Sequence, residues 1–91
     1  MAVSVRLPTV LRPQAGGAST VEADGGTVGE VMNDIVNRFP TMKDNLLDDE
    51  GGVRKFVNIY LNDEDIRYLD QLDTGVNEGD EVSILPAVAG G

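Results

Sequence analysis

The C-terminal residues are the part of this chain best suited to chemistry, because they present a free carboxylate on a thin, uncharged arm. Residues 85–91 read Leu-Pro-Ala-Val-Ala-Gly-Gly and contain no ionisable side chain. Pro86 cannot donate a hydrogen bond to a neighbouring strand, so a strand would naturally end there. Beyond it, Ala87, Val88, Ala89, Gly90 and Gly91 could reach about 17 Å when extended. The pattern favours an arm that delivers the Gly91 carboxylate into a partner's active site, against the ordinary alternative of a frayed terminus.

The composition removes several kinds of chemistry from the side chains. The chain has no cysteine and no histidine, so it lacks thiolate nucleophiles, disulfides, the commonest general acid/base and the commonest soft metal ligands. Any chemistry must therefore use carboxylates, lysines, hydroxyls or the chain termini.

The charge balance also limits the choice of partners. The net charge is −9, and the seven basic residues are scattered along the sequence. Nucleic acid would be repelled, whereas a basic docking surface on a partner would attract the chain; solubility alone explains the charge equally well. No apolar run approaches a membrane span, and we expect a cytoplasmic protein with no membrane partner.

Strands are predicted from side-chain alternation. Residues 2–7 place Val3, Val5 and Leu7 on one side, and residues 55–62 and 81–85 alternate in the same way. A second strand is predicted at residues 18–23, after a loop that carries Pro8, Pro13 and a glycine pair.

One main helix is predicted after Thr27. Thr27 and Glu30 have the spacing of a capping box, and Pro40 prevents the helix from continuing. The apolar residues between them follow helical spacing and are interpreted as core: Val28, Val31, Met32, Ile35, Val36 and Phe39. Residues 41–52 are polar around Met42, Leu46 and Leu47, and the acidic run at their end is interpreted as a solvated turn.

These elements predict an α+β fold, with a mixed sheet of four to five strands covered on one face by the main helix. Residues 1–86 would form the domain and residues 87–91 a flexible tail. The other sheet face would stay open, and alternation places Phe56, Tyr60 and Leu85 on it. We interpret these three as a docking surface, although isolated exposed apolar residues need no partner.

Two acidic stretches are possible metal sites, but neither has the pattern of ligands that such a site needs. The acids at residues 48–50 lie on a predicted loop without a defined coordination pattern. An EF-hand loop that starts at Asp63 is rejected, because Tyr68 would occupy the glycine position and Thr74 the glutamate position.

Four segments resemble the ubiquitin-like β-grasp sulfur carriers of the ThiS/MoaD family, and most closely the actinobacterial CysO subgroup. They are residues 7–13 (LPTVLRP), 56–67 (FVNIYLNDEDIR), 79–82 (GDEV) and 84–91 (ILPAVAGG). The resemblance implies a β-grasp fold and a reagent, not a catalyst, with no catalytic residue, no metal and no cofactor bound by this chain.

The resemblance also implies partners and their cofactors. A ubiquitin-activating-type enzyme would use ATP and magnesium to adenylate the Gly91 carboxylate and would then convert it to a thiocarboxylate. The tail from Pro86 to Gly91 would enter partner active sites. The sulfur acceptor would be a pyridoxal-phosphate cysteine synthase or a thiosugar synthase, and a metalloprotease would release the product.

Other functions remain open at this point. The chain could be the small subunit of molybdopterin synthase, a protein modifier joined to lysines through Gly91, or a plain binding domain with an incidental tail.

Overall fold

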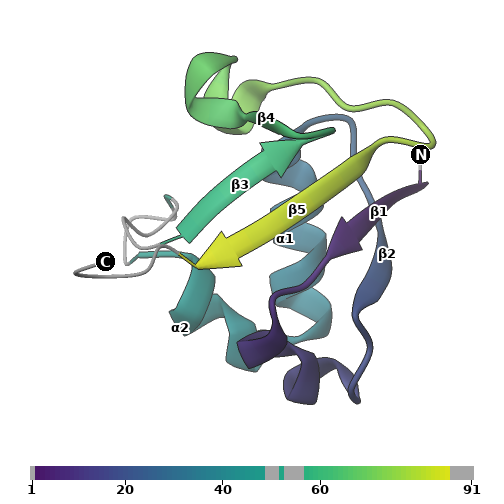
Figure 1. Ribbon diagram of the computed structural model, residues 1–91, viewed down its shortest axis with the longest axis vertical. Coiled ribbons are helices and arrows are strands. Elements are labelled where there is room, and N and C mark those ends of the chain that lie inside the picture. Colours follow the sequence, from purple (N-terminus) through teal and green to yellow (C-terminus); the bar gives the residue numbers. More distant parts are fainter. Residues whose placement is uncertain (1, 49–51, 53–56, 87–91) are drawn as a thin grey trace.

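A mixed five-stranded sheet with strand order β2-β1-β5-β3-β4 organises the chain. The computed structural model describes residues 2–48, 52 and 57–86. Strands β1 and β5 run parallel, and the other neighbouring strands run antiparallel. Helix α1 covers one face of the sheet (Figure 1), which confirms the predicted α+β class. The strands are β1 (Ala2–Arg6), β2 (Thr20–Asp24), β3 (Val57–Leu61), β4 (Glu64–Asp65) and β5 (Glu81–Pro86).

The neighbouring strands β1 and β5 bury their alternate side chains as the sequence predicts. Val3 and Val5 of β1 are at most 1% exposed, and so are Val82 and Ile84 of β5. Strand boundaries differ from the prediction by one or two residues, and Lys55 and Phe56 of the predicted third strand lie outside the described residues. Strand β5 ends at Pro86 as expected.

Helix α1 (Val28–Arg38) begins with a capping box that differs slightly from the predicted one. The Glu30 backbone N–H donates to Thr27 Oγ1 at 3.2 Å, while the Glu30 carboxylate accepts from the Gly26 N–H at 2.7 Å. The carboxylate thus reaches one residue beyond the usual partner, the N-cap amide. The predicted apolar stripe is buried, except that Phe39 is half-buried at the helix end.

The segment after β1 is more ordered than the predicted loop. It forms a 3-10 helix, η1 (Thr9–Ala15), which buries Leu11 and ends at Gly16 with a φ of 69°. That left-handed conformation suits a residue without a Cβ. This helix contains Pro13, and proline adds nothing to a hydrophobic period, so side-chain alternation could not reveal the helix.

A second short helical segment follows α1. The 3-10 helix η2 (Pro40–Met42) leads directly into α2 (Lys43–Leu46), and Met42, Leu46 and Leu47 are buried. The sequence predicts no helix in this segment, which it describes only as polar around these three side chains. A four-residue helix is too short to show a helical period.

The free edge of β2 is covered by two side chains of α1. The Asp24 backbone N–H donates to Asp34 Oδ2 at 2.9 Å, and Arg38 donates to the Glu22 carbonyl. Asp34 and Arg38 also form an ion pair at 3.4 Å. Because the backbone groups of an edge strand are templates for pairing with another chain, this cover disfavours association through β2.

A tight turn joins β3 to β4 and ties both to β5. Asn62 and Asp63 have φ angles of 50° and 74°, as a two-residue hairpin turn requires. Asn62 exchanges two hydrogen bonds with Glu81, at 2.9 and 3.0 Å. Asp80 accepts from the Asn77 backbone N–H and the Asn62 amide, and these bonds lower the pKa of the Asp80 carboxyl.

Asp65 is the buried carboxylate of this region. It accepts from the Arg67 backbone N–H at 2.9 Å and pairs with the Arg67 guanidinium at 2.8 Å. The hydrogen bonds from the Arg67 side chain and backbone hold the pKa of Asp65 below its usual value, against the opposing effect of burial. The pair fixes the start of η3 (Ile66–Tyr68), which lies between β4 and η4 (Gln71–Asp73).

Among the described residues, none of the helices has the length and apolar character needed to cross a bilayer.

Replacing Asp65 with asparagine should lower the free energy of unfolding at neutral pH. A carboxyl whose folded pKa is depressed adds stability above its unfolded pKa, and that stability is lost as the pH falls through the folded pKa. The stability difference between wild type and Asp65→Asn should therefore shrink below about pH 4. Urea unfolding across the acidic range measures it, with Asp63→Asn, an exposed neighbour, as the control. A difference that does not change with pH would contradict this account.

Candidate functional site at the end of the central strand

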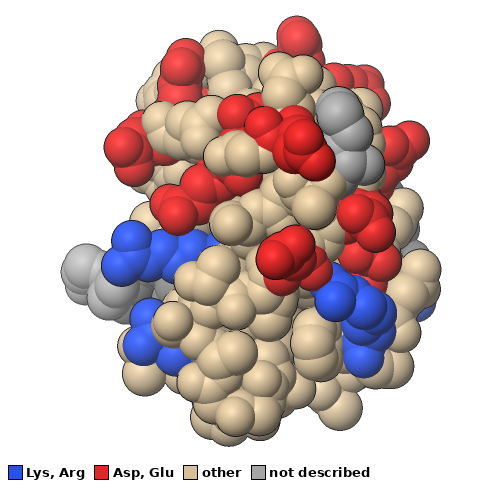
Figure 2. Space-filling model, turned by 90° about the vertical axis from the view of Figure 1, so that its right-hand side faces the viewer, with Lys and Arg blue, Asp and Glu red and all other residues tan. Residues whose placement is uncertain are grey.

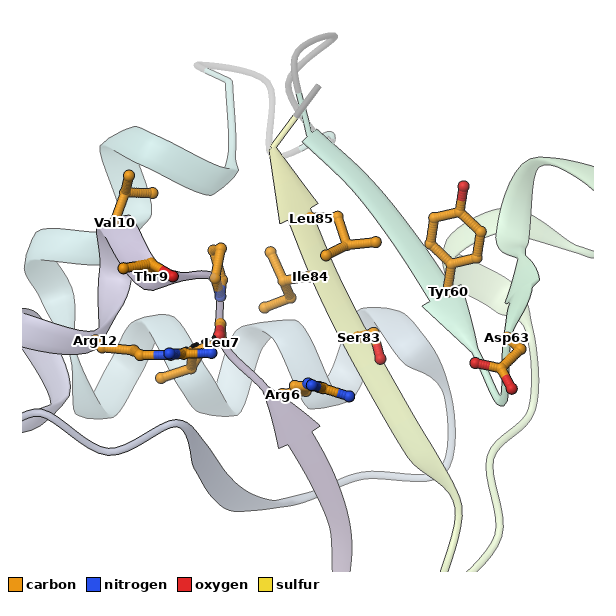
Figure 3. A pocket seen from close by; sticks show the side chains of 11 residues that line it. Arg6, Leu7, Thr9, Val10, Arg12, Tyr60, Asp63, Ser83, Ile84 and Leu85 are labelled. Carbon is orange, nitrogen blue, oxygen red and sulfur yellow. Dashed lines mark hydrogen bonds between the residues drawn. The ribbon is translucent and has the colours of Figure 1, made fainter. Parts of the chain in front are cut away.

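A wide hollow of about 670 Å³ lies on the sheet face opposite α1 (Figure 3). The end of β1, the start of η1, and strands β3 and β5 form its walls. We call it the open-face hollow. Its lining residues are Arg6, Leu7, Pro8, Thr9, Val10, Arg12, Tyr60, Asp63, Ser83, Ile84 and Leu85.

Two of the three predicted docking residues line the open-face hollow. Tyr60 lies opposite Ser83, and Leu85 lies opposite Asn58, so both side chains point to the same face of neighbouring strands. Leu85 is 45% exposed and Tyr60 is half-buried. The structure therefore brings Tyr60 and Leu85 together as alternation predicted, while Phe56 lies outside the described residues. A docking role for them stays a prediction.

The predicted tail starts at the rim of this hollow. Pro86 is the last residue of β5, pairs with Val57 in register, and directly follows Leu85. Residues 87–91, which include the Gly91 carboxylate, lie outside the described residues. The structure thus places the root of the tail beside the open-face hollow, and the flexibility of the tail stays a prediction.

Two arginines of the hollow were missed by the sequence analysis. Arg6 ends β1 and Arg12 lies in η1, and Figure 3 shows both side chains beside the hollow. The Arg12 Nε donates to the Leu7 carbonyl at 3.2 Å. The basic residues are scattered along the sequence, but Arg6 and Arg12 line the same hollow. The turn of the chain after Leu7 brings them together, and sequence spacing carries no signal of that turn.

The acidic residues in the described part of the chain do not form a candidate metal site. Within residues 2–48, 52 and 57–86, no group of three carboxylates converges as a metal site would require. Asp65 is engaged by Arg67, and Asp48 Oδ1 accepts from the Gly52 N–H at 2.9 Å. Asp49 and Glu50, which the sequence analysis weighed with Asp48, lie outside the described residues.

Comparisons with known proteins match this chain over almost its full length. The sulfur carrier protein CysO of Mycobacterium tuberculosis is 46% identical over 93 aligned residues, which cover 100% of both chains. A chain in the crystal structure of the Amycolatopsis orientalis BexX/CysO complex is 45% identical, with a TM-score of 0.88, over 98% of this chain and 99% of that one.

A more distant relative has the same fold. The solution structure of the small archaeal modifier protein 1 from Methanosarcina acetivorans is 31% identical, with a TM-score of 0.87, over 99% of this chain and 96% of that one. These likenesses confirm the ubiquitin-like β-grasp fold. The model of the ThiS family matches residues 5–91. The chain therefore belongs to the ThiS family.

Proposed function

We propose that this chain is a sulfur carrier whose Gly91 carboxylate is adenylated and then converted to a thiocarboxylate. The thiocarboxylate would donate sulfur in cysteine biosynthesis or in the formation of a related metabolite such as a thiosugar. The likeness to CysO over the whole chain carries the proposal. The end of β5 beside an exposed hollow supports it, because a tail rooted there can enter a partner that docks on the sheet.

The chemistry explains why a second enzyme is needed. A carboxylate is a poor electrophile until one of its oxygens becomes part of a leaving group. Attack of the Gly91 carboxylate on the α-phosphorus of ATP releases pyrophosphate and forms the acyl adenylate. A sulfur nucleophile then forms a bond to the carbonyl carbon, and AMP leaves. Magnesium and ATP belong to the activating enzyme, and this chain supplies only the acyl group.

The folded body would act by binding and not by catalysis. Tyr60 and Leu85 offer a half-buried aromatic ring and an exposed aliphatic side chain beside the tail root. Aromatic and aliphatic anchors of this kind carry much of the energy of protein interfaces. Phe56, two residues before Asn58 on the same alternating face of the sequence, is part of the proposed surface.

The proposal includes three partners: an adenylating enzyme of the ubiquitin-activating type, a sulfur-acceptor enzyme, and a metalloprotease that releases the product. The acceptor would be a pyridoxal-phosphate cysteine synthase or a thiosugar synthase. CysO of Amycolatopsis orientalis forms a complex with BexX, which supports an enzyme partner for this chain as well. Because activation consumes ATP, the cytoplasm is the proposed location.

A second candidate function is protein modification. The likeness to the small archaeal modifier protein 1 supports it, because a modifier would use the same activated Gly91 carboxylate. A ladder of conjugates detected with an antibody against the carrier would favour this function. No described feature favours the small subunit of molybdopterin synthase over the sulfur carrier.

Removing Gly91 should abolish activation and leave the melting temperature unchanged. The described core is complete without the tail, because β5 ends at Pro86. Adenylation is measured as ATP–pyrophosphate exchange with the ThiS-activating enzyme from the same genome. The deletion leaves a carboxylate on Gly90, one residue short, so Gly91→Ala, which keeps the length of the tail, is the matched control and should retain part of the exchange. Full exchange after the deletion would refute the proposed role of Gly91.

Replacing Tyr60 or Leu85 with aspartate should weaken binding to the activating enzyme by about tenfold or more, as expected for interface anchors. Tyr68→Asp is the matched control, because Tyr68 is 83% exposed and lies outside the open-face hollow. Isothermal titration calorimetry measures the affinities. Leu85→Asp should change stability by only about 0.5 kcal/mol. Equal affinities for the Tyr60 and Tyr68 variants would show that the hollow is not the interface.

A further inference from the structure

Arg6 and Arg12 differ from two other described arginines in having no carboxylate partner among the described residues. Arg38 pairs with Asp34 at 3.4 Å, and Arg67 pairs with Asp65 at 2.8 Å. The hydrogen bond from Arg12 Nε to the Leu7 carbonyl holds the stem of that side chain in place. Its terminal nitrogens have no hydrogen bond within the described residues. Two guanidinium groups at the hollow are thus left able to bind an anionic group.

The position of Arg6 and Arg12 is unusual for a chain with a net charge of −9. Residues 1–21 contain both arginines and no acidic residue, whereas residues 63–81 contain eight of the sixteen acids. Figure 2 shows one face of the molecule, on which Asp and Glu gather in the upper half of the view and Lys and Arg lie below them. A cationic group on an acidic protein would selectively attract an anionic partner to one place.

The open-face hollow itself is polarised. Figure 3 shows Arg12 and Arg6 on one side and Asp63 on the other, beyond Tyr60. A carboxylate would be attracted at the arginine side and repelled at the Asp63 side. Exposed apolar side chains also line the hollow, among them Leu85 at 45% and Val10 at 68% exposure, and Figure 3 shows Val10 on the Arg12 side.

We propose that the open-face hollow receives an extended peptide segment of a partner in which carboxylates are followed by apolar side chains. The carboxylates bind Arg6 and Arg12, because guanidinium groups match carboxylate geometry. The apolar side chains pack between Val10, Tyr60 and Leu85. The inference rests on the proposed function in one respect: the segment belongs to an enzyme that engages the tail.

This arrangement gives the two arginines a specificity role. The contact orients the partner relative to Pro86, so that the tail root points into the partner and not away from it. A basic segment would lose the attraction at Arg6 and Arg12, and like charges brought together at an interface are unfavourable. Arg6 and Arg12 are therefore positioning residues for the carrier and take no part in the chemistry at Gly91.

The test is an NMR titration of the full-length, ¹⁵N-labelled chain with two synthetic peptides. The first is acetyl-Glu-Glu-Glu-Leu-Phe-Leu-amide, and the second replaces each glutamate with glutamine. Because the chain is strongly acidic, general electrostatics disfavours the first peptide, so its preferential binding would have to come from a local cationic site. The expected result is saturable shifts at the amides of Arg6, Tyr60 and Leu85, with the glutamine peptide binding about fivefold more weakly.

Three variants make the assignment specific. Arg6→Gln and Arg12→Gln should each weaken binding of the acidic peptide about two- to fivefold, as for an exposed charge pair. Arg12→Lys tests whether the positive charge alone is sufficient, because it keeps that charge and loses the hydrogen bond from Arg12 Nε to the Leu7 carbonyl. Lys43→Gln is the control, because it removes one exposed positive charge outside the hollow.

The inference is overturned if both peptides bind equally, if the shifted amides lie away from the hollow, or if Lys43→Gln weakens binding as much as Arg6→Gln. Displacement of the acidic peptide by equimolar inorganic phosphate would also overturn it, because the site would then be a simple anion site. No activating enzyme is present in the titration, so these outcomes are independent of whether Gly91 is adenylated.

Discussion

The pairing of β5 between two strands is the constraint on which the rest of the structure depends. β5 pairs with β1 in parallel on one side and with β3 antiparallel on the other. As a result, Val82 and Ile84 are buried on the sheet face that α1 covers, and Ser83 and Leu85 lie on the opposite face. The chain therefore leaves the centre of the sheet at Pro86, next to residues of β1, β3 and η1. If the C-terminal strand were instead an edge strand, in the position of β2 or β4, the root of the tail would lie away from this hollow.

Much of this fold follows from patterns in the sequence. Alternation predicted the buried faces of β1, β3 and β5, and the Thr27 and Glu30 spacing predicted the start of α1. The short helices η1 and α2 could not be predicted in this way, since each buries its few apolar side chains without a measurable period. The meeting of Arg6 with Arg12 was also missed, because it depends on the bend after Leu7. Phe56 and the tail lie outside the described residues, so their predicted roles rest on the sequence and the family.

The molecule separates a stable body from the group proposed to react. The hydrophobic core is built from α1, the sheet and the short helical segments. On the face shown in Figure 2, Asp and Glu gather apart from Lys and Arg, and Arg6 and Arg12 line the open-face hollow. Under the proposed function, recognition and chemistry could vary independently, because partner enzymes would supply the reagents and the body would supply only orientation.

The central claim is that Gly91 carries sulfur, and intact-protein mass spectrometry tests it most directly. The chain would be expressed with its activating enzyme and a sulfur source, and a C-terminal peptide would locate any change of mass. The account predicts the mass gain of one oxygen exchanged for sulfur at Gly91, which disappears when Gly91 is removed. A chain that keeps its unmodified carboxylate although the enzyme activates a known carrier would contradict the account.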